Sequence, residues 1–269
     1  MDQRCFENAL ALRDSGHSED AAKKFRAMAM EASDINERAS LMINEVRCYC
    51  NLGWLNDAEC TLKRIRELSP DDPVVCANVD FGAACLAAQK GQFKDALREF
   101  EKMLSEHDQL FETSEYRDLY EDIQTRRAIA LAKLGRHSEA VSVFGQTKSF
   151  ITLGVEDWQE VHLYEGICYS ELHESDRAKK AYLLAIDCDV ESTIRAEARY
   201  RVAILYFKEG AFAQAKRQLE MILANHNGDL PNLPQSYVYE QLARTCNYLG
   251  QARDAEKYMK MARESQRRS

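Results

Sequence analysis

Proline is scarce in this sequence. Only four prolines occur among 269 residues, in two pairs, Pro70 with Pro73 and Pro231 with Pro234. Glycine is also infrequent, with eleven residues, and six of these recur at a regular spacing described below. Flexible linkers are typically rich in glycine, serine or proline. Because little such material is left over, we predict a single domain over residues 1–269.

Basic residues are too few to make the chain positively charged. Lys and Arg number 36 against 44 Asp and Glu, which gives a net charge of −8 at pH 7. Residues 1–134 hold 25 acidic and 18 basic side chains, so most of the acidic excess lies in the first half. Non-specific nucleic-acid binding depends on neutralising phosphates with Lys and Arg. We therefore expect no nucleic-acid partner.

Long apolar runs are lacking as well. No stretch of 18 apolar residues occurs, although a membrane-spanning helix needs about that length. The first residues, Met1–Cys5, contain neither the basic region nor the apolar core of a secretory signal. We expect no membrane partner and a cytoplasmic location.

Paired cysteine motifs are also missing. The sequence has nine cysteines but no Cys-x-x-Cys, and Cys48 and Cys50 would face different directions on a helix. Unpaired cysteines in a reducing compartment are commonly small buried apolar residues. We interpret most of these nine in that way.

Catalytic signatures are not found either. Neither a phosphate-binding glycine loop nor a nucleophile elbow nor a zinc-protease helix motif occurs. The six histidines are scattered, and no pair of carboxylates is singled out for acid–base work. We expect no catalytic residue, no metal, no cofactor and no enzyme activity.

What the sequence does contain is a repeat. Turn-forming residues recur 37 to 44 positions apart, and each is followed five positions later by alanine and nine positions later by a large apolar residue. A small residue, or valine, stands seven positions before each turn. The turn positions are Gly16, Gly53, Gly91, Gly135, His173, Gly210 and Gly250. The alanines are Ala21, Ala58, Ala96, Ala140, Ala178, Ala215 and Ala255, and the large residues are Phe25, Leu62, Phe100, Phe144, Tyr182, Leu219 and Met259.

This pattern predicts helical hairpins. Two antiparallel helices need small residues where their axes approach to about 8–10 Å. The large residue lies one turn beyond the alanine on the same helix face and can fill the gap to the next hairpin. Glycine ends the first helix easily because it adopts left-handed conformations without a Cβ clash. Ser18, Asn56, Ser138 and Ser175 are the N-cap residues that we predict for second helices.

These residues resemble the tetratricopeptide repeat (TPR) family over nearly the whole chain. The resemblance implies an all-α fold, a right-handed superhelix of about seven hairpins. Two features depart from the family: the tryptophan-like position eleven before each turn is degenerate, and the period exceeds the usual 34 residues. The predicted hairpins span about 2–32, 37–68, 74–105, 115–150, 157–188, 192–224 and 235–263.

Two stretches interrupt the regular pattern. Residues 106–122 are rich in Asp and Glu and suit a solvated helix extension, or alternatively a docking patch for a basic partner. The fourth hairpin has Gly145 in its second helix. Twelve positions past its turn stands Thr147, where the other hairpins have Met28, Ile65, Met103, Ala185, Ile222 and Ala262. This hairpin is either a flexible waist or simply a hairpin with a shorter second helix, and we favour the latter.

In the family that this chain resembles, first helices line a groove that binds peptides or partner helices. The lysine and two asparagines with which one subgroup clamps chaperone C-termini do not occur together here. Groove positions in the C-terminal half carry five aromatic residues, against Phe6 and Phe81 in the first three hairpins. The predicted partner-binding residues are Tyr164, Tyr200, Arg201, Phe207, Tyr237, Arg244, Asn247 and Tyr248.

The function that follows is that of a non-enzymatic scaffold. Aromatic residues and arginine dominate binding energy when they fill pockets, although a tyrosine on a first helix can also simply pack against its neighbour. We expect a protein or peptide partner of unknown identity, and a monomer or weak homodimer. The alternative is a regulatory sensor whose solenoid closes on a small peptide or metabolite.

Overall fold

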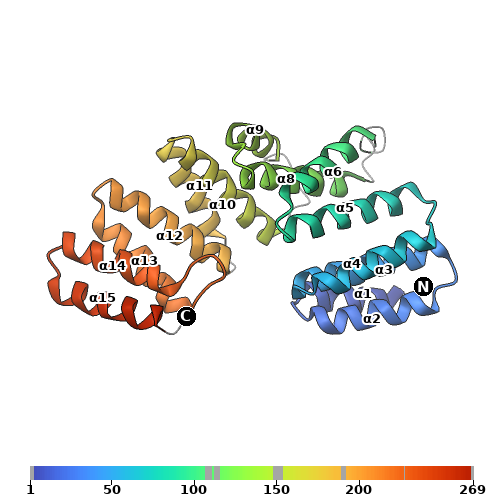
Figure 1. Cartoon of the computed structure of the whole chain (residues 1–269), viewed down its shortest axis with the longest axis horizontal. Helices are drawn as coiled ribbons and strands as arrows, with labels where there is room; N and C mark the ends of the chain where they lie inside the picture. The colour runs from blue at the N-terminus through green and yellow to red at the C-terminus, as the bar shows by residue number, and fades with distance from the viewer. Residues whose placement is uncertain are drawn as a thin grey trace. The chain divides into compact units, whose positions relative to one another are not determined.

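The computed structural model describes residues 3–106, 111, 116–147, 154–188, 192–226 and 228–267. Within those ranges the chain forms 14 α-helices and no β-strand, apart from an isolated bridge between Leu230 and Leu233 (Figure 1). The predicted all-α fold is confirmed. None of the helices in these ranges is long and apolar enough to cross a membrane.

The helices fall into two compact units, residues 1–135 and 136–269. The first unit contains α1 (Gln3–Asp14), α2 (Ser18–Glu31), α3 (Ile35–Leu52), α4 (Leu55–Leu68), α5 (Pro73–Gln89), α6 (Phe93–Glu106) and α8 (Arg117–Lys133). The second contains α9 (His137–Thr147), α10 (Val155–Glu171), α11 (Ser175–Asp187), α12 (Thr193–Lys208), α13 (Phe212–Asn225), α14 (Gln235–Tyr248) and α15 (Ala252–Gln266).

Each unit is built from successive hairpins. The pairs α1–α2, α3–α4 and α5–α6 pack within the first unit, and α10–α11, α12–α13 and α14–α15 within the second. The second helix of one hairpin also packs on the first helix of the next, as α2 does on α3 and α11 on α12. The predicted hairpin limits agree with these helices to within a few residues where both ends are described. Residue 115 and residues 148–150 of the predicted fourth hairpin lie outside the described ranges, and the single domain stays a prediction.

The turns inside six of the hairpins share one recurring geometry. At the turn before α2, Gly16 has φ +84° and its N–H donates to the Arg13 carbonyl, while the next N–H, of His17, donates to the Leu12 carbonyl at 2.8 Å. This pair of bonds is the Schellman motif, which satisfies carbonyls at the end of a helix. The same bonds form at the turns of Gly53, Gly91, His173, Gly210 and Gly250.

This geometry corrects the predicted N-caps. The turn is shorter than we expected, so Ser18 and Ser175 are already the first residues of α2 and α11. Asn56 and Ser138 lie in the first turn of α4 and α9. The residues at the N-caps of α2, α4 and α11, which are His17, Trp54 and Glu174, make no side-chain capping bond. The backbone turn, rather than a capping side chain, therefore sets where the second helix begins.

His173 is the one turn position without glycine, and we expect His173→Gly to stabilise the protein by about 0.5–1 kcal/mol. Its φ is +61°, where an L side chain is strained by about 1–2 kcal/mol. Part of that gain is lost because glycine makes the unfolded chain more flexible. Urea unfolding would measure the change in the free energy of unfolding. The reverse substitution, Gly210→His at φ +77°, should lower the free energy of unfolding by a similar amount. Equal stability of the native chain and both variants would contradict the strain argument.

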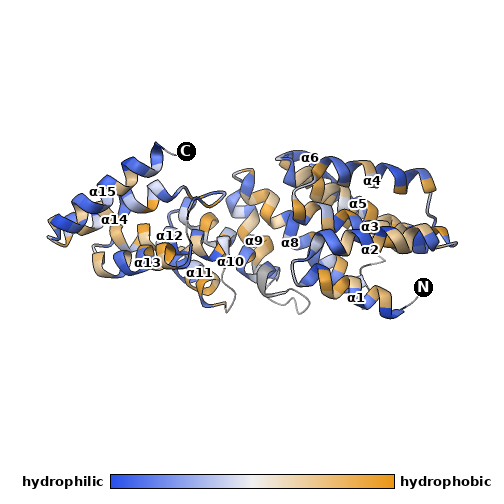
Figure 2. Ribbon diagram, turned by 90° about the horizontal axis from the view of Figure 1, so that it is seen from below, coloured by the Kyte–Doolittle hydropathy of each residue, from blue (hydrophilic) through white to orange (hydrophobic). Residues whose placement is uncertain are grey.

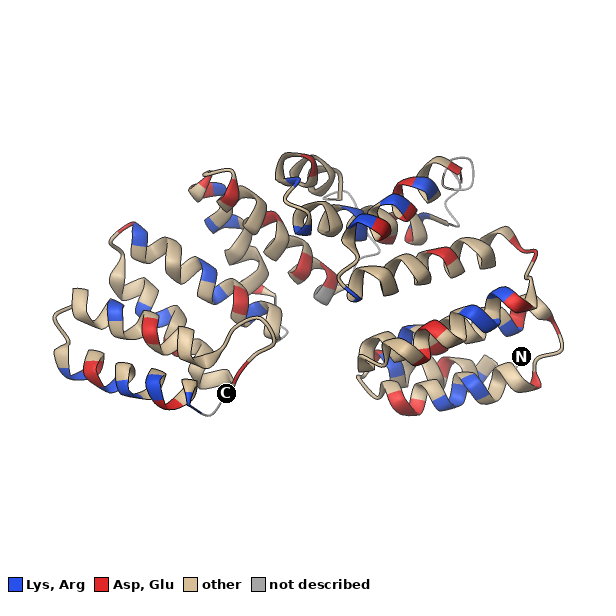
Figure 3. Ribbon diagram, in the orientation of Figure 1, with Lys and Arg blue, Asp and Glu red and all other residues tan. Residues whose placement is uncertain are grey.

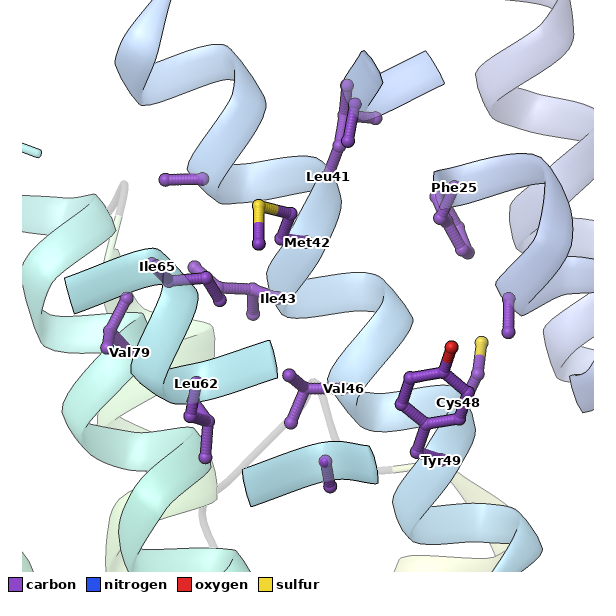
Figure 4. Close-up of a cluster of buried hydrophobic side chains, with 14 of the residues drawn as sticks. Phe25, Leu41, Met42, Ile43, Val46, Cys48, Tyr49, Leu62, Ile65 and Val79 are labelled. Atoms are coloured by element: carbon purple, nitrogen blue, oxygen red, sulfur yellow. The ribbon is translucent and has the colours of Figure 1, made fainter. Parts of the chain in front are cut away.

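The repeated positions form the cores of both units. The alanine five past each turn is buried in every hairpin, and so is the large residue nine past the turn in the first six. Met259, the seventh, is partly exposed. Figure 4 shows Phe25 and Leu62 of this series among the side chains that fill the first unit, with Ile65 and Val79 between α4 and α5. In Figure 2, α5 is largely apolar along its length, whereas α15 is largely hydrophilic.

The two irregular stretches are only partly described. In the acidic stretch, Glu121 is not solvated: it is buried and its carboxylate lies 2.8 Å from Arg117 Nε. Asp108, Glu112 and Glu115 lie outside the described residues. The second helix of the fourth hairpin, α9, has 11 described residues. Because residues 148–153 lie outside the described ranges, the interpretation as a shorter helix stays a prediction. Thr147 of α9 is buried and donates to the Phe144 carbonyl.

Candidate partner-binding groove

In the second unit, first helices α10 and α12 pack side by side, and the segment after α13 closes one side of the space between them. A small cavity of about 110 Å³ lies there, lined by Tyr164 of α10, Glu197 of α12 and residues 230–233. Leu230 and Leu233 exchange backbone hydrogen bonds of 3.2 and 3.1 Å, which fix this turn. Leu233 is buried in the core formed by α12, α13 and α14. This packing holds residues 230–233, which form one wall of the cavity, in place.

Arg201 is held on the same helix as Glu197. Its Nε and Nη2 donate to Glu197 Oε1 at 3.0 and 2.7 Å. Burial by itself would lower the pKa of the Arg201 guanidinium, but the hydrogen bond and charge of Glu197 outweigh burial and raise it. Tyr182, which is buried next to Arg201, has a pKa raised by burial to about 12, so its hydroxyl stays neutral at physiological pH. Arg201 is therefore already neutralised within the protein.

Tyr200, Tyr237 and Arg244 come together on α12 and α14. Tyr200 is half-buried on the core of this unit, and that burial raises its pKa, while the positive charge of Arg244 acts in the opposite direction. Tyr237 is 52% exposed and Arg244 is exposed. Among the residues that the structure describes, Arg244 forms no ion pair. An unpaired guanidinium beside two phenol rings can bind a carboxylate and the apolar part of a peptide.

The other three predicted residues lie elsewhere. Phe207 and Tyr248 form an aromatic cluster with Phe212 at the turn edge of the last two hairpins. The rings of Phe212 and Tyr248 stack with centroids 4.8 Å apart, although Tyr248 is 66% exposed. Asn247 lines a cleft on α15 rather than the groove. Of the eight residues, Tyr164 lines the cavity, Arg201 is hydrogen-bonded to Glu197 of the same cavity, and Tyr200, Tyr237 and Arg244 lie near one another on α12 and α14.

Two elements of the groove escaped the sequence reasoning. Glu197, which orients Arg201, was not singled out, although its spacing of four residues from Arg201 is typical of a helical ion pair. Residues 230–233 were not among the predicted partner-binding residues. The signal that could have revealed them is their two leucines, which are unusual in a solvated loop and are buried or partly buried here.

Comparison with known proteins shows what this arrangement resembles. No protein-family model matches the sequence, and no curated protein matches it significantly in sequence. The apo form of the quorum sensor NprR from B. thuringiensis has 14% sequence identity and a TM-score of 0.77, over 99% of this chain and 76% of that chain. A tetratricopeptide repeat protein from Parabacteroides merdae has 16% identity and a TM-score of 0.55, over 98% and 92%. PilF from Pseudomonas aeruginosa has 15% identity and a TM-score of 0.63, over 83% and 90%.

The chain has the tetratricopeptide repeat fold.

The first TPR unit has a different inner surface. Arg13 Nη1 of α1 donates to Asn44 Oδ1 of α3 at 2.9 Å, and Arg47 Nη2 of α3 donates to Asn78 Oδ1 of α5 at 3.2 Å. Each asparagine also donates its amide to a carbonyl of its own helix. A cavity of about 180 Å³ lies between α3 and α5, but the polar groups that line it largely satisfy one another.

Phe81 does not belong to that surface. We expected it at a groove position, yet it is only 7% exposed and its ring lies 6.1 Å from that of buried Phe100. Phe6 likewise packs edge-on against Phe25, with centroids 6.0 Å apart. Both aromatic residues that we expected at groove positions of the first unit therefore pack in the TPR core.

The cysteines have mixed environments. Cys48, Cys168 and Cys246 are buried, Cys5 and Cys60 are exposed and the other four are partly exposed, so the interpretation that most of the cysteines are buried is wrong. Burial raises the pKa of Cys48 to about 11 and that of Cys168 to about 12, which keeps both thiols protonated and unreactive. The described residues contain no cluster of three or more His, Cys, Asp or Glu side chains placed to hold a metal ion.

Proposed function

We propose that the chain is a non-enzymatic scaffold that binds a peptide segment of a partner protein along α10, α12 and α14. The observation that carries this proposal is the exposed pair Tyr237 and Arg244 beside half-buried Tyr200. These are the residue types that supply most binding energy at protein interfaces. Arg244 favours a carboxylate on the bound segment, either an Asp or Glu side chain or a C-terminus.

We prefer the second unit over the first because its exposed side chains are available to a ligand, whereas the polar side chains of the first unit are bound to one another. In the first unit, Asn44 and Asn78 are occupied by Arg13 and Arg47, and a ligand would have to break those hydrogen bonds. Binding that displaces an existing hydrogen bond gains little net free energy. In the second unit, Tyr237 projects more than half of its surface into solvent. A partner can cover it without breaking an internal contact.

A regulatory sensor is the second candidate, because NprR, which matches nearly the whole chain in fold, is a quorum sensor. Small-molecule sites usually enclose about 300–1,000 Å³. The cavity beside Tyr164 is about 110 Å³, which suits one side chain of a longer segment better than an engulfed metabolite. Native mass spectrometry of the purified protein separates the two: a bound small molecule supports the sensor, and a stoichiometric protein supports the scaffold.

The scaffold proposal is tested by Tyr237→Ala combined with Arg244→Ala. Once a partner has been identified by co-purification, we expect this variant to bind it at least about thirtyfold more weakly, because loss of interface tyrosine and arginine typically raises the binding free energy by about 2 kcal/mol or more. Isothermal titration calorimetry would measure the affinity. Both side chains are exposed, so the fold should be unaffected.

The matched control is Leu184→Ala with Arg217→Ala. These are exposed residues of the second helices α11 and α13, and they change the same number of apolar and cationic side chains in the same unit. Equal affinity of the Tyr237/Arg244 variant and the native chain would refute a groove on α14. Equal loss in the control would mean that the partner recognises overall charge rather than the groove.

A further inference from the structure

The small cavity between α10 and α12 has a lining in which every charged residue is acidic. Glu160 of α10 and Glu197 of α12 line it, and the described residues around it include no Lys, Arg or His. Red bands on α10 and α12 in Figure 3 mark the acidic residues of these two helices. The rest of the lining is neutral and largely aliphatic, with Leu163, Ile194 and residues 230–233. We call this space the α10–α12 cavity.

The carboxylate of Glu197 has acceptor capacity left. Its side chain is mostly buried, with 14% exposed, and its Oε1 accepts both hydrogen bonds from Arg201. Its Oε2 accepts from Nδ2 of Asn232 at 3.5 Å, whereas such bonds are usually about 2.7–3.2 Å long. Each oxygen of an ionised carboxylate can accept about two hydrogen bonds. Because Glu197 and Asn232 both line the cavity, a group bound there can donate a shorter bond to Oε2.

Three kinds of occupant fit this lining poorly. A carboxylate on the ligand would face Glu160 and Glu197, and like charges repel strongly in a poorly solvated site. An apolar side chain would cover the carboxylate of Glu197 without donating a hydrogen bond to it, which costs free energy. A calcium ion takes about six to eight oxygen ligands, and the described residues hold no group of three or more His, Cys, Asp or Glu placed for a metal ion. The lining therefore selects an organic cation.

A lysine or arginine side chain meets both requirements of the α10–α12 cavity. Its methylene stem can pack on the aliphatic part of the lining while its charged end donates hydrogen bonds to the carboxylates. The volume of about 110 Å³ is far below the 300–1,000 Å³ that usually encloses a small molecule. The cavity is therefore suited to the end of one side chain and not to a whole metabolite.

We propose that the α10–α12 cavity binds a Lys or Arg side chain of the segment that the groove holds. This inference rests on the proposed scaffold function and adds to it the chemical class of one bound residue. The segment then carries a basic side chain for this cavity in addition to the carboxylate that Arg244 favours. The net charge of −8 assists at long range, because it attracts basic segments more than acidic ones.

The test begins with random dodecapeptides displayed on phage and selected on the native chain. Salt at about 0.15 M screens long-range attraction between surface charges during the selection. We expect the enriched peptides to share a Lys or Arg. Synthetic copies in which uncharged citrulline or norleucine replaces that residue should bind at least tenfold more weakly, as measured by fluorescence anisotropy.

The decisive variant is Glu160→Gln with Glu197→Gln, which removes both carboxylates from the cavity while glutamine at 197 can still accept from Arg201. On this variant, replacing the basic residue of the peptide should weaken binding less than threefold. The control is Glu220→Gln with Glu256→Gln, which makes the same change in net charge at exposed sites of α13 and α15. On the control, the replacement should still weaken binding at least tenfold.

Thermal unfolding followed by circular dichroism verifies that both variants fold. If the double variant does not fold, Glu160→Gln alone decides, since Glu160 is only half-buried. On that variant the effect of replacing the basic residue should shrink at least threefold relative to the native chain. An unchanged effect would overturn the inference.

The outcomes separate this inference from the groove function. Enriched peptides without Lys or Arg, or an equal effect of the replacement on native chain and cavity variant, would overturn the inference. The groove function would stand if those peptides still lost affinity for the Tyr237→Ala, Arg244→Ala variant. Peptides that need their basic residue and the two glutamates, yet bind the Tyr237/Arg244 variant as tightly as the native chain, would support the cavity and refute the groove on α14. A selection that enriches no peptide would overturn both.

Discussion

Phe100→Ala should lower the free energy of unfolding by about 3–5 kcal/mol, because truncating a fully buried phenylalanine removes its apolar contacts and leaves a cavity. Phe100 is 0% exposed and stands nine residues past the turn of the third hairpin. Its ring meets Phe81 on α5, so the cavity would open inside the hairpin. Urea unfolding monitored by circular dichroism would measure the loss.

The matched change is Met259→Ala, at the same repeat position on α15. Because Met259 is partly exposed, its truncation returns little apolar surface to water, and we expect a loss of about 1 kcal/mol or less. A loss equal to that of Phe100→Ala would show that something covers Met259 in solution. That outcome would point to self-association through the side of α15 that carries Met259, which sedimentation would detect.

The sequence was sufficient to predict the hairpins because their determinants are local. A residue in the left-handed region, an alanine five residues later and a large apolar residue nine later act within a single hairpin. Those offsets placed the core correctly at Ala21 and Phe25 and at their counterparts along the chain, except at Met259, which is partly exposed. The N-caps were predicted wrongly because the Schellman turn leads into the second helix sooner than we expected, so Ser18 and Ser175 already stand inside α2 and α11.

The groove was less predictable because its exposure depends on pairings between hairpins. Offsets from the turn treat Arg201 and Arg244 as equivalent cations, yet Glu197 neutralises one and the other forms no ion pair among the described residues. They also place Phe207 and Tyr248 in the groove, whereas contact with Phe212 holds both at the turn edge. Which side chain reaches which neighbour depends on three-dimensional distances that a single sequence does not state.

Gly166→Leu should destabilise the protein by about 3 kcal/mol, at the upper end of the range for overpacking a core. Gly166 lies in α10, seven residues before its turn, where five of the other hairpins have alanine. A Cβ at Gly166 would lie 2.5 Å from Cε1 and 2.6 Å from Cδ1 of the Tyr182 ring. Tyr182 is 1% exposed and belongs to α11 of the same hairpin, so the ring has no room to withdraw.

The comparison that isolates this contact is Gly145→Leu in α9. Nothing lies within 4 Å of a Cβ built at Gly145, and the residue is exposed within a helix. Replacing an exposed helical glycine by leucine gains about 0.5–1 kcal/mol of helix propensity. The same substitution should therefore have opposite signs at the two sites. Adding Tyr182→Ala to Gly166→Leu should recover part of the loss, because the leucine then occupies space that the ring has left. If Gly166→Leu proved as stable as the native chain, the small residue before the turn would not be what sets the distance between the two helices of a hairpin.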